Sequence, residues 1–267
     1  MVVTYVGVGT GQLFLNLADP LDYPLFILTS VLISLAVVPL LLSAGPTPPF
    51  RQSTRVNIVD LYRISPLGVV GIFAVGLVTA SFFALGPVYG QRIGLDIKSI
   101  SFFMTAAVAG TILFQWPIGA LSDRYDRRRV LTTASILTAI AAFACVPISG
   151  LSTLALMLAT GLFGGLAFPL YALCIAHTND HLDPGEMVAA SATLVLIGGI
   201  GAVIGPVLVA AIMDRFGDDS FFWSLGGVHV LTGIFAIYRM LRRPPPPPEE
   251  QGPYSPTTIH PSSAVIE

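Results

Sequence analysis

The chain has 267 residues, of which 54% are hydrophobic and only 10% are charged, with a formal net charge of -2. Its mean hydropathy of +0.80 lies far above that of an ordinary soluble domain. This composition excludes a soluble globular protein and predicts an all-α polytopic membrane protein. A transmembrane barrel is excluded because the apolar runs are long and do not alternate with polar residues.

The chain opens on a shortened apolar segment, residues 1–17, and no signal peptide is expected because a basic region and cleavage site are missing. Further along, the sequence holds seven charge-free segments long enough to cross about 30 Å of hydrocarbon. The short connections between them favour a compact helical bundle. The segments cover residues 24–43, 66–90, 99–121, 130–148, 152–176, 187–213 and 220–238.

Two stretches of the chain share a pattern of two glycines four residues apart, followed further on by an aspartate. Either stretch alone is a common helix-packing face, because small residues at this spacing let membrane helices approach closely. Their correspondence indicates a repeated architecture, in which residues 24–43 are the equivalent of residues 220–238. The stretches are Gly7-x-x-x-Gly11-Gln12, with Asp19 beyond it, and Gly201-x-x-x-Gly205-Pro206, with Asp214 beyond it.

Two segments differ in composition from the apolar spans. Residues 44–65 are Pro-rich and then basic, which is typical of a linker. Two alternatives remain open for this linker. It either lies on the membrane surface through Val56, Val59 and Tyr62, or it is simply solvated. Residues 242–267 form a Pro-rich polar tail that cannot bury a core, and we expect it to be disordered.

A few side chains within the spans are candidates for a solute pathway. Gln115 is costly inside a membrane unless it faces water or pairs with another helix, and the same two alternatives hold for Gln12. Thr79, Phe82 and Phe83 lie on overlapping faces of one helix, where ordinary packing is the alternative.

The segment 152–176 is rich in glycine and contains Phe168-Pro169-Leu-Tyr171, a composition that favours a break in the helix. After it, His177 and His181 are four residues apart with carboxylates nearby, which is only half of a metal site. We expect no metal there. Asp183 and Glu186 instead predict an N-cap and a capping box that open the next helix.

The densest charge cluster of the chain is the short loop 119–131, Gly-Ala-Leu-Ser-Asp-Arg-Tyr-Asp-Arg-Arg-Arg-Val-Leu. Arginines in a short loop between two spans resist translocation, so this loop is expected on the cytoplasmic side. Most other arginines then fall on the same side, which makes the topology self-consistent. Topological anchoring alone is the simpler interpretation of these arginines.

The order of this loop, G-x-L-x-D-R-x-x-R-R-x-x-L, resembles the motif between the second and third helices of each half of major facilitator superfamily transporters. The resemblance implies that Asp123 and Arg124 latch neighbouring helix ends together, with Arg127 and Arg128 as basic partners, and that Gly119 lets a neighbouring helix approach closely. Asp126 stands where the family has glycine. Aspartate tolerates the left-handed conformation of such a turn.

Further stretches resemble the YcaD-like branch of bacterial members of this superfamily, among them LYRISPLGVVG (61–71), LGPVYGQRIGL (85–95) and QWPIGALSDRYDRRR (115–129). The resemblance implies the last two helices of an N-terminal half in residues 1–43, a cytoplasmic linker in 44–65 and a complete six-helix half in 66–241. About four helices of a twelve-helix protein would be missing. The implied substrate cavity is formed by Gln12, Thr79, Phe82, Phe83, Gln115, Phe168 and Tyr171.

The expected function is secondary active or facilitative transport of a small solute by alternating access, as part of a longer protein in the bacterial inner membrane with a cytoplasmic C-terminus. The expected partners are the bilayer and a small-molecule substrate, with a coupling ion left open, and no nucleic acid or cofactor. An enzyme is not expected, because the sequence lacks G-x-S-x-G, H-E-x-x-H and a phosphate-binding glycine loop. The alternative is a truncated, non-transporting membrane protein that acts through assembly.

Overall fold

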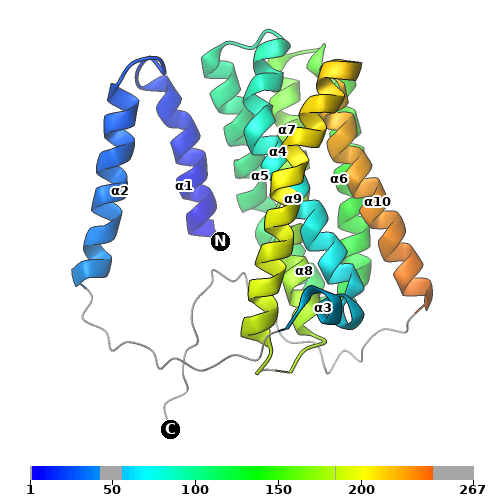
Figure 1. The fold of residues 1–267 in the computed structure, drawn as a ribbon. Coiled ribbons are helices and arrows are strands. Elements are labelled where there is room, and N and C mark those ends of the chain that lie inside the picture. The colour runs from blue at the N-terminus through cyan, green and yellow to red at the C-terminus, as the bar shows by residue number, and fades with distance from the viewer. Residues whose placement is uncertain (1, 43–55, 184, 243–267) are drawn as a thin grey trace.

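The computed structural model describes residues 2–42, 56–183 and 185–242, and every regular element within these ranges is a helix. Figure 1 shows two parts, a helical hairpin and a body of packed helices. The hairpin consists of α1 (Val2–Leu13), the 3-10 turn η1 (Phe14–Asn16) and α2 (Pro24–Leu42). The expected linker residues 44–55 and tail residues 243–267 lie outside the described residues.

The body contains six described segments that are long and apolar enough to cross a membrane, α7 and α8 together forming one of them. A short helix, α3 (Ile58–Ile64), lies at the lower end of the body in Figure 1. This end also holds the arginine loop, and we call it the loop end. The long helices are α4 (Pro66–Arg92), α5 (Ile97–Arg124), α6 (Arg127–Ser149), α7 (Thr153–Ala167), α8 (Leu170–Asn179), α9 (Met187–Phe216) and α10 (Ser220–Arg242).

Side-chain caps fix where several body helices begin. The carboxylate of Asp96 accepts a hydrogen bond from the backbone N–H of Ser99 at 3.0 Å and opens α5. Ser152 opens α7 in the same way. The capping box expected at residues 183–186 is wrong, because α9 begins at Met187. Glu186 stands at its N-cap, with helical backbone angles and no side-chain capping bond.

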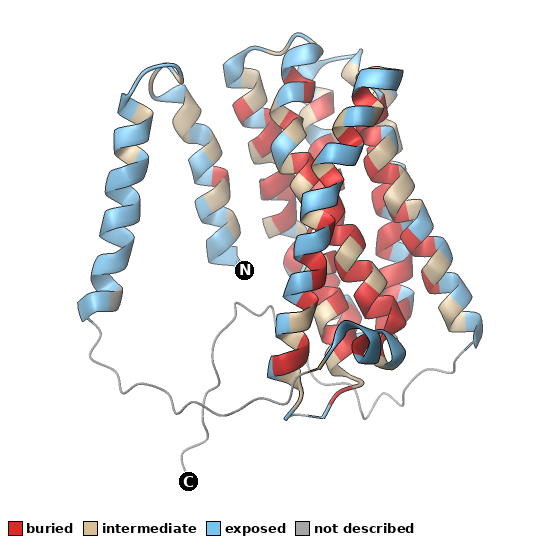
Figure 2. Ribbon diagram, in the orientation of Figure 1, coloured by how far each residue is buried: buried red, intermediate tan, exposed pale blue. Residues whose placement is uncertain are grey.

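Glycines set the closest helix contacts of the body. A Cβ on Gly201 or Gly205 of α9 would collide with backbone carbonyls of α4, and one on Gly110 of α5 would collide with the carbonyl of Gly161 in α7. These helices therefore touch through their backbones. Such close packing holds helices together inside lipid, where no hydrophobic driving force acts between them. Figure 2 shows the resulting buried core within the body, whereas the hairpin is largely exposed.

The fourth membrane segment breaks where its composition predicts. α7 ends at Ala167 and α8 begins at Leu170, with Phe168 and Pro169 between them. Proline has no backbone N–H to donate to the carbonyl four residues earlier, so the helical ladder is interrupted here. The break places Phe168 against Phe82 and Phe83 of α4.

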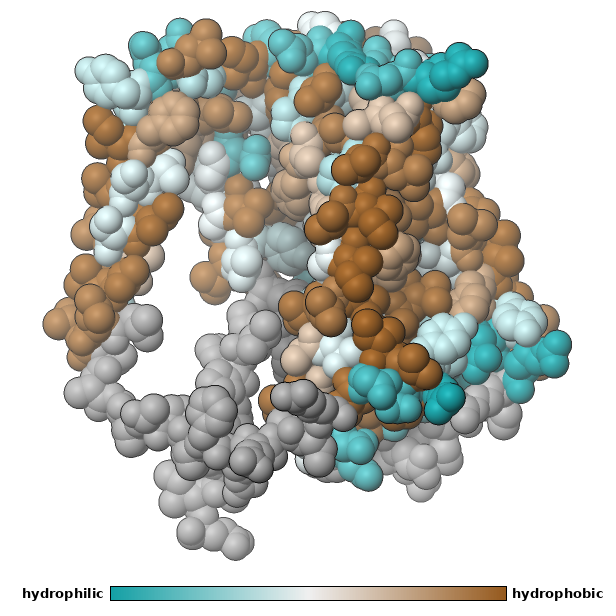
Figure 3. All heavy atoms as spheres, viewed as in Figure 1, coloured by the Kyte–Doolittle hydropathy of each residue, from teal (hydrophilic) through white to brown (hydrophobic). Residues whose placement is uncertain are grey.

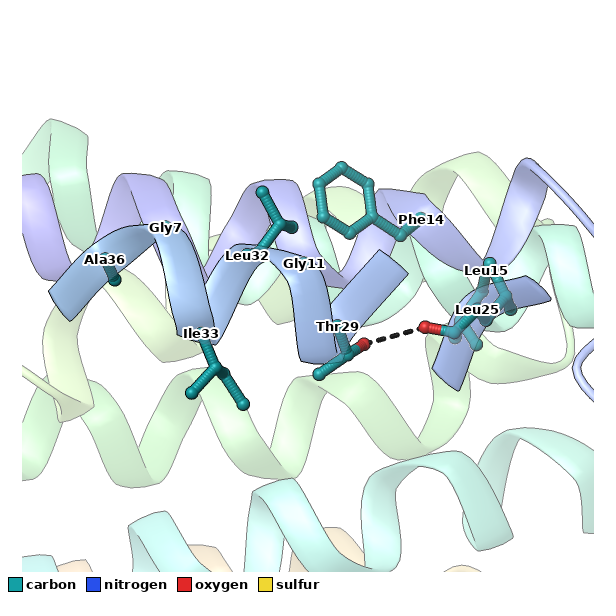
Figure 4. Close-up of a pocket in the computed structure, with 9 residues that line it drawn as sticks. All are labelled: Gly7, Gly11, Phe14, Leu15, Leu25, Thr29, Leu32, Ile33 and Ala36. Carbon is teal, nitrogen blue, oxygen red and sulfur yellow. Dashed lines mark hydrogen bonds between the residues drawn. The ribbon is translucent and has the colours of Figure 1, made fainter. Parts of the chain in front are cut away.

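The hairpin meets the body along α1 and α5. The fully buried hydroxyl of Ser101 donates a hydrogen bond to the backbone carbonyl of Gln12 at 2.5 Å and accepts one from the side-chain amide of Asn16 at 2.9 Å. Further along, Gly9 is buried against Val108. Between α1 and α2 lies an apolar groove of about 410 Å³, whose lining residues are drawn in Figure 4.

Candidate conformational latch

The centre of the arginine loop is the side chain of Arg127, the first residue of α6, which is only 3% exposed. Its guanidinium forms ion pairs with Asp180 and, at 3.4 Å, with Asp123. It also donates a hydrogen bond to the backbone carbonyl of Ala176 at 3.2 Å. One cation therefore joins the starting end of α6 to the loop ends of α5 and α8.

The two acids differ in their surroundings. The side chain of Asp180, directly after α8, is 4% exposed, whereas that of Asp123 on α5 is 39% exposed. Removing one partner of a buried ion pair leaves the other charge desolvated and unpaired, which is far more costly than breaking an exposed pair. The bond between Arg127 and Asp180 is therefore the stronger tie of the cluster, and it couples α6 to α8.

Arg128 and Asp126 form a second, local pair. The carboxylate of Asp126 accepts a hydrogen bond from the backbone N–H of Arg128 at 2.9 Å and pairs with its guanidinium at 3.1 Å. Asp126 thereby caps α6, and its backbone lies outside the left-handed region that the glycine of the family motif suggests. The pair holds the turn rigidly, because both side chains are largely buried.

The other predicted latch residues lie at the edge of this cluster. Arg124, the last residue of α5, is exposed, and the arginine that pairs with the buried Asp180 is Arg127 instead. Gly119 is buried on α5, one turn before Asp123. The sequence interpretation had not assigned Asp180 to the latch. One feature of the sequence points to Asp180. It is an acid at the end of an apolar span, on the same side of the membrane as the arginine loop.

Three of the predicted cavity residues meet at the break between α7 and α8. The rings of Phe83 and Phe168 stack with centroids 5.4 Å apart, and Phe82 contacts both rings edge-on. Phe82 and Phe168 are buried, whereas Phe83 is partly exposed. Further rings, among them Phe163 and Phe221, extend this cluster toward the end opposite the loop.

The remaining predicted cavity residues are more scattered. Thr79 on α4 and Tyr171 on α8 are partly exposed, as a wall residue would be. Gln115 on α5 is 3% exposed and lies within the helix packing. Gln12 lies at the seam between the hairpin and the body, where its backbone carbonyl accepts the bond from Ser101. The aromatic wall and the two glutamines are therefore separate features.

A comparison with known proteins identifies the scaffold that carries these features. Residues 67–264 match the model of the Major Facilitator Superfamily. The chain belongs to this superfamily. It is therefore related to membrane transporters and not to enzymes, and the loop 119–131 lies within the matched residues.

The superfamily relatives of this chain include transporters of enteric bacteria. An uncharacterized MFS-type transporter of Yersinia enterocolitica is 27% identical over 91% of this chain and 62% of the relative. One of Enterobacter sp. is 30% identical over 85% of this chain and 59% of the relative. YcaD of Escherichia coli is 29% identical over the same shares. The chain thus spans about three fifths of the length of these MFS-type transporters.

Proposed function

We propose that this chain carries a small solute across the bacterial inner membrane by alternating access, as a secondary active or facilitative transporter and as part of a longer twelve-helix protein. The observation that carries the proposal is the buried Arg127, which ties Asp123 on α5 to Asp180 after α8. Membership of the superfamily supports it. A buried ion pair between helix ends is suited to a two-state element, since it is either fully formed or costly to open.

In this proposal the latch controls the angle between α7 and α8. Asp180 lies at the far end of α8, and the break at Phe168 and Pro169 lies at its near end. Releasing Asp180 from Arg127 would free α8 to move about the break, beside the stacked rings of Phe83 and Phe168. Thr79, Phe83 and Tyr171 would form the part of the wall that a solute contacts, with Phe82 supporting it from behind.

The proposal also assigns the helices to two halves. α1 and α2 would be the last two helices of the N-terminal half, and α4 to α10 the six-span C-terminal half. The positive-inside rule supports a cytoplasmic loop end, because Arg124, Arg127, Arg128 and Arg129 all lie there. Arg242, at the end of α10, lies at the same end, which supports a cytoplasmic C-terminus.

The test is transport by the longer protein that contains this chain, reconstituted in liposomes, using a panel of radiolabelled neutral, anionic and cationic small solutes. We expect flux above that of protein-free liposomes for at least one solute, and we expect Asp123→Asn to reduce it without preventing membrane insertion. Asp60→Asn is the matched control, because Asp60 forms an exposed pair with Arg63 on α3. Normal flux in Asp123→Asn would refute the latch.

The second candidate is a non-transporting membrane protein that acts through assembly. The observation that favours it is that the chain spans only 59–62% of the length of its relatives. Absence of flux for every solute of the panel, both in the longer protein and in the chain alone, would support this candidate. Flux by the 267-residue chain alone would exclude it.

A further inference from the structure

The arginines at the loop end fall into two groups. Arg127 and Arg128 are buried and held by aspartates, as described above. Arg129 and Arg242 are exposed and Arg239 is half-buried, and none of these three forms an ion pair with a carboxylate within the described residues. These three cations are therefore available to an anion from outside the chain.

The three arginines lie at the same end of α6 and α10, which pack side by side. The hydroxyl of Thr132 on α6 lies 3.5 Å from the sulfur of Met240 on α10. Arg129 precedes Thr132 by about one helical turn, so it lies beside the last turn of α10, which carries Arg239 and Arg242.

An apolar seam continues from these arginines toward the middle of the helices. Gly233 of α10 lies against Ile136 of α6, where a Cβ on the glycine would be 3.2 Å from the isoleucine. The exposed side chains along the seam are aliphatic, among them Ile140 on α6, and Ile234 and Ile237 on α10. Figure 3 shows hydrophilic side chains gathered at the lower end of α10, next to the hydrophobic flank of the body.

The ring of Tyr238 completes the site. It is 48% exposed, and the guanidinium of Arg242 lies over it at 5.4 Å from the ring centroid. Such stacking holds the planar guanidinium in a fixed orientation while leaving its N–H donors free. We call Arg129, Arg239, Arg242 and Tyr238, with the apolar seam beside them, the α6–α10 basic seam.

We propose that the α6–α10 basic seam binds the phosphodiester headgroup of an anionic phospholipid, whose acyl chains lie along the seam. Guanidinium groups match phosphate oxygens through paired charge-assisted hydrogen bonds, and they stay charged at every physiological pH. Basic clusters between membrane helices, beside an apolar surface, suit anionic lipid headgroups. The inference does not depend on the transport proposal or on the orientation of the chain.

The experiment titrates the purified full chain in detergent with phosphatidylglycerol or phosphatidylcholine of identical acyl chains, and counts bound lipids by native mass spectrometry. We expect tighter binding of phosphatidylglycerol. Each of the substitutions Arg129→Gln, Arg239→Gln and Arg242→Gln should weaken it about five-fold, since one arginine near a membrane surface contributes about 1 kcal/mol. The triple variant should bind the two lipids equally.

The matched control is Arg215→Gln. Arg215 lies over the ring of Phe216 at 5.9 Å, so it reproduces the arrangement of Arg242 and Tyr238 at the opposite end of the body. This variant should keep the preference for phosphatidylglycerol. Circular dichroism checks that all variants fold, and the single variants provide the test if the triple variant does not.

Three results would overturn the proposal. The first is equal affinity of the unsubstituted chain for phosphatidylglycerol and phosphatidylcholine. The second is a preference for phosphatidylglycerol that survives in the triple variant or is lost equally in Arg215→Gln. The third is displacement of the bound lipid by inorganic phosphate at the same concentration as the lipid, which would indicate an anion site that ignores the acyl chains.

Discussion

The same glycine pattern occurs in α1 of the hairpin and in α9 of the body, but the two copies have different surroundings. Gly201 and Gly205 of α9 lie against the backbone of α4, where a side chain would collide. Gly7 and Gly11 of α1 have no atom within 4 Å of the place that a Cβ would occupy, and they line the groove beside α2 in Figure 4. The glycine pattern therefore predicts that another helix can approach closely. Whether one does so depends on where the neighbouring helix lies.

The charges of the two parts differ in the same way. In the body, Arg127 is buried and tied to acids from two other segments. In the hairpin, Asp19 is exposed and accepts a hydrogen bond only from the nearby backbone N–H of Leu21 at 3.0 Å. The buried charge of the body thus pairs with acids of other segments, whereas the exposed charge of the hairpin makes a local contact. Four experiments test this difference.

The largest effect is expected for Arg127→Gln in the body. It leaves the carboxylate of Asp180 buried without its cation, so the free energy of unfolding should fall by about 3–5 kcal/mol. Asp19→Asn in the hairpin should change it by less than about 0.5 kcal/mol. Chemical denaturation in mixed micelles measures both values, and similar losses in the two variants would contradict the contrast.

The second effect compares the glycines directly. Gly201→Ala forces a methyl group against the carbonyl of Phe73 and should destabilise the body by about 1–3 kcal/mol. Gly7→Ala has open space and should be neutral or stabilise α1 by about 0.5–1 kcal/mol, because alanine is the better helix former. Thermal unfolding in one detergent compares the pair, and an equal loss in both would refute this account of the two surroundings.

A smaller effect is expected at the seam between the parts. Ser101→Ala removes the hydroxyl that joins Gln12 and Asn16, which should cost about 0.6 kcal/mol. Hydrogen exchange of the α1 amides should become faster, while that of α9 stays unchanged. Thr105→Ala is the control, because the Thr105 hydroxyl bonds only within α5, to the carbonyl of Ser101. Equally faster exchange of α1 in the control would argue against the seam contact.

The smallest effect is expected at the end of the body opposite the loop. Arg92 pairs with Asp214 at 2.8 Å and Asp218 at 3.4 Å, and all three side chains are substantially exposed. Arg92→Gln should lower the melting temperature slightly at low ionic strength and leave it unchanged at about 1 M salt, where such pairs are screened. A large loss that persists at high salt would mean that this pair acts like the buried one.

Some of these features could be predicted from the sequence and others could not. The break at Phe168 and Pro169 was predictable, because a missing N–H acts on the local backbone whatever the surroundings. The importance of the arginine loop was equally visible from its charge. The partner of Arg127 could not be predicted, because Asp180 stands 53 positions away in the sequence. A local sequence pattern does not show which distant acid a cation will pair with.

The cavity residues show the same division. Helical spacing correctly put Phe82 and Phe83 on neighbouring faces, but the stacking of Phe83 on Phe168 depends on how α4 approaches the α7–α8 break. For Gln115 the sequence favours an interhelical bond over the pathway, and its burial within the bundle follows from contacts that only the fold determines. The sequence pattern shows which residues share a face of a helix. Which residues of other helices that face contacts is known only from the fold.

The break between α7 and α8 also gives the molecule a lever. α8 has ten residues and is therefore about 15 Å long, with the joint at Phe168 and Pro169 at one end and Asp180 at the other. A tilt of about 10° at the joint would move Asp180 by roughly 2.6 Å along the arc of this length. That displacement is comparable to the span of an ion pair, so in the proposed cycle a small rotation beside the Phe83 ring would open or close the contact with Arg127.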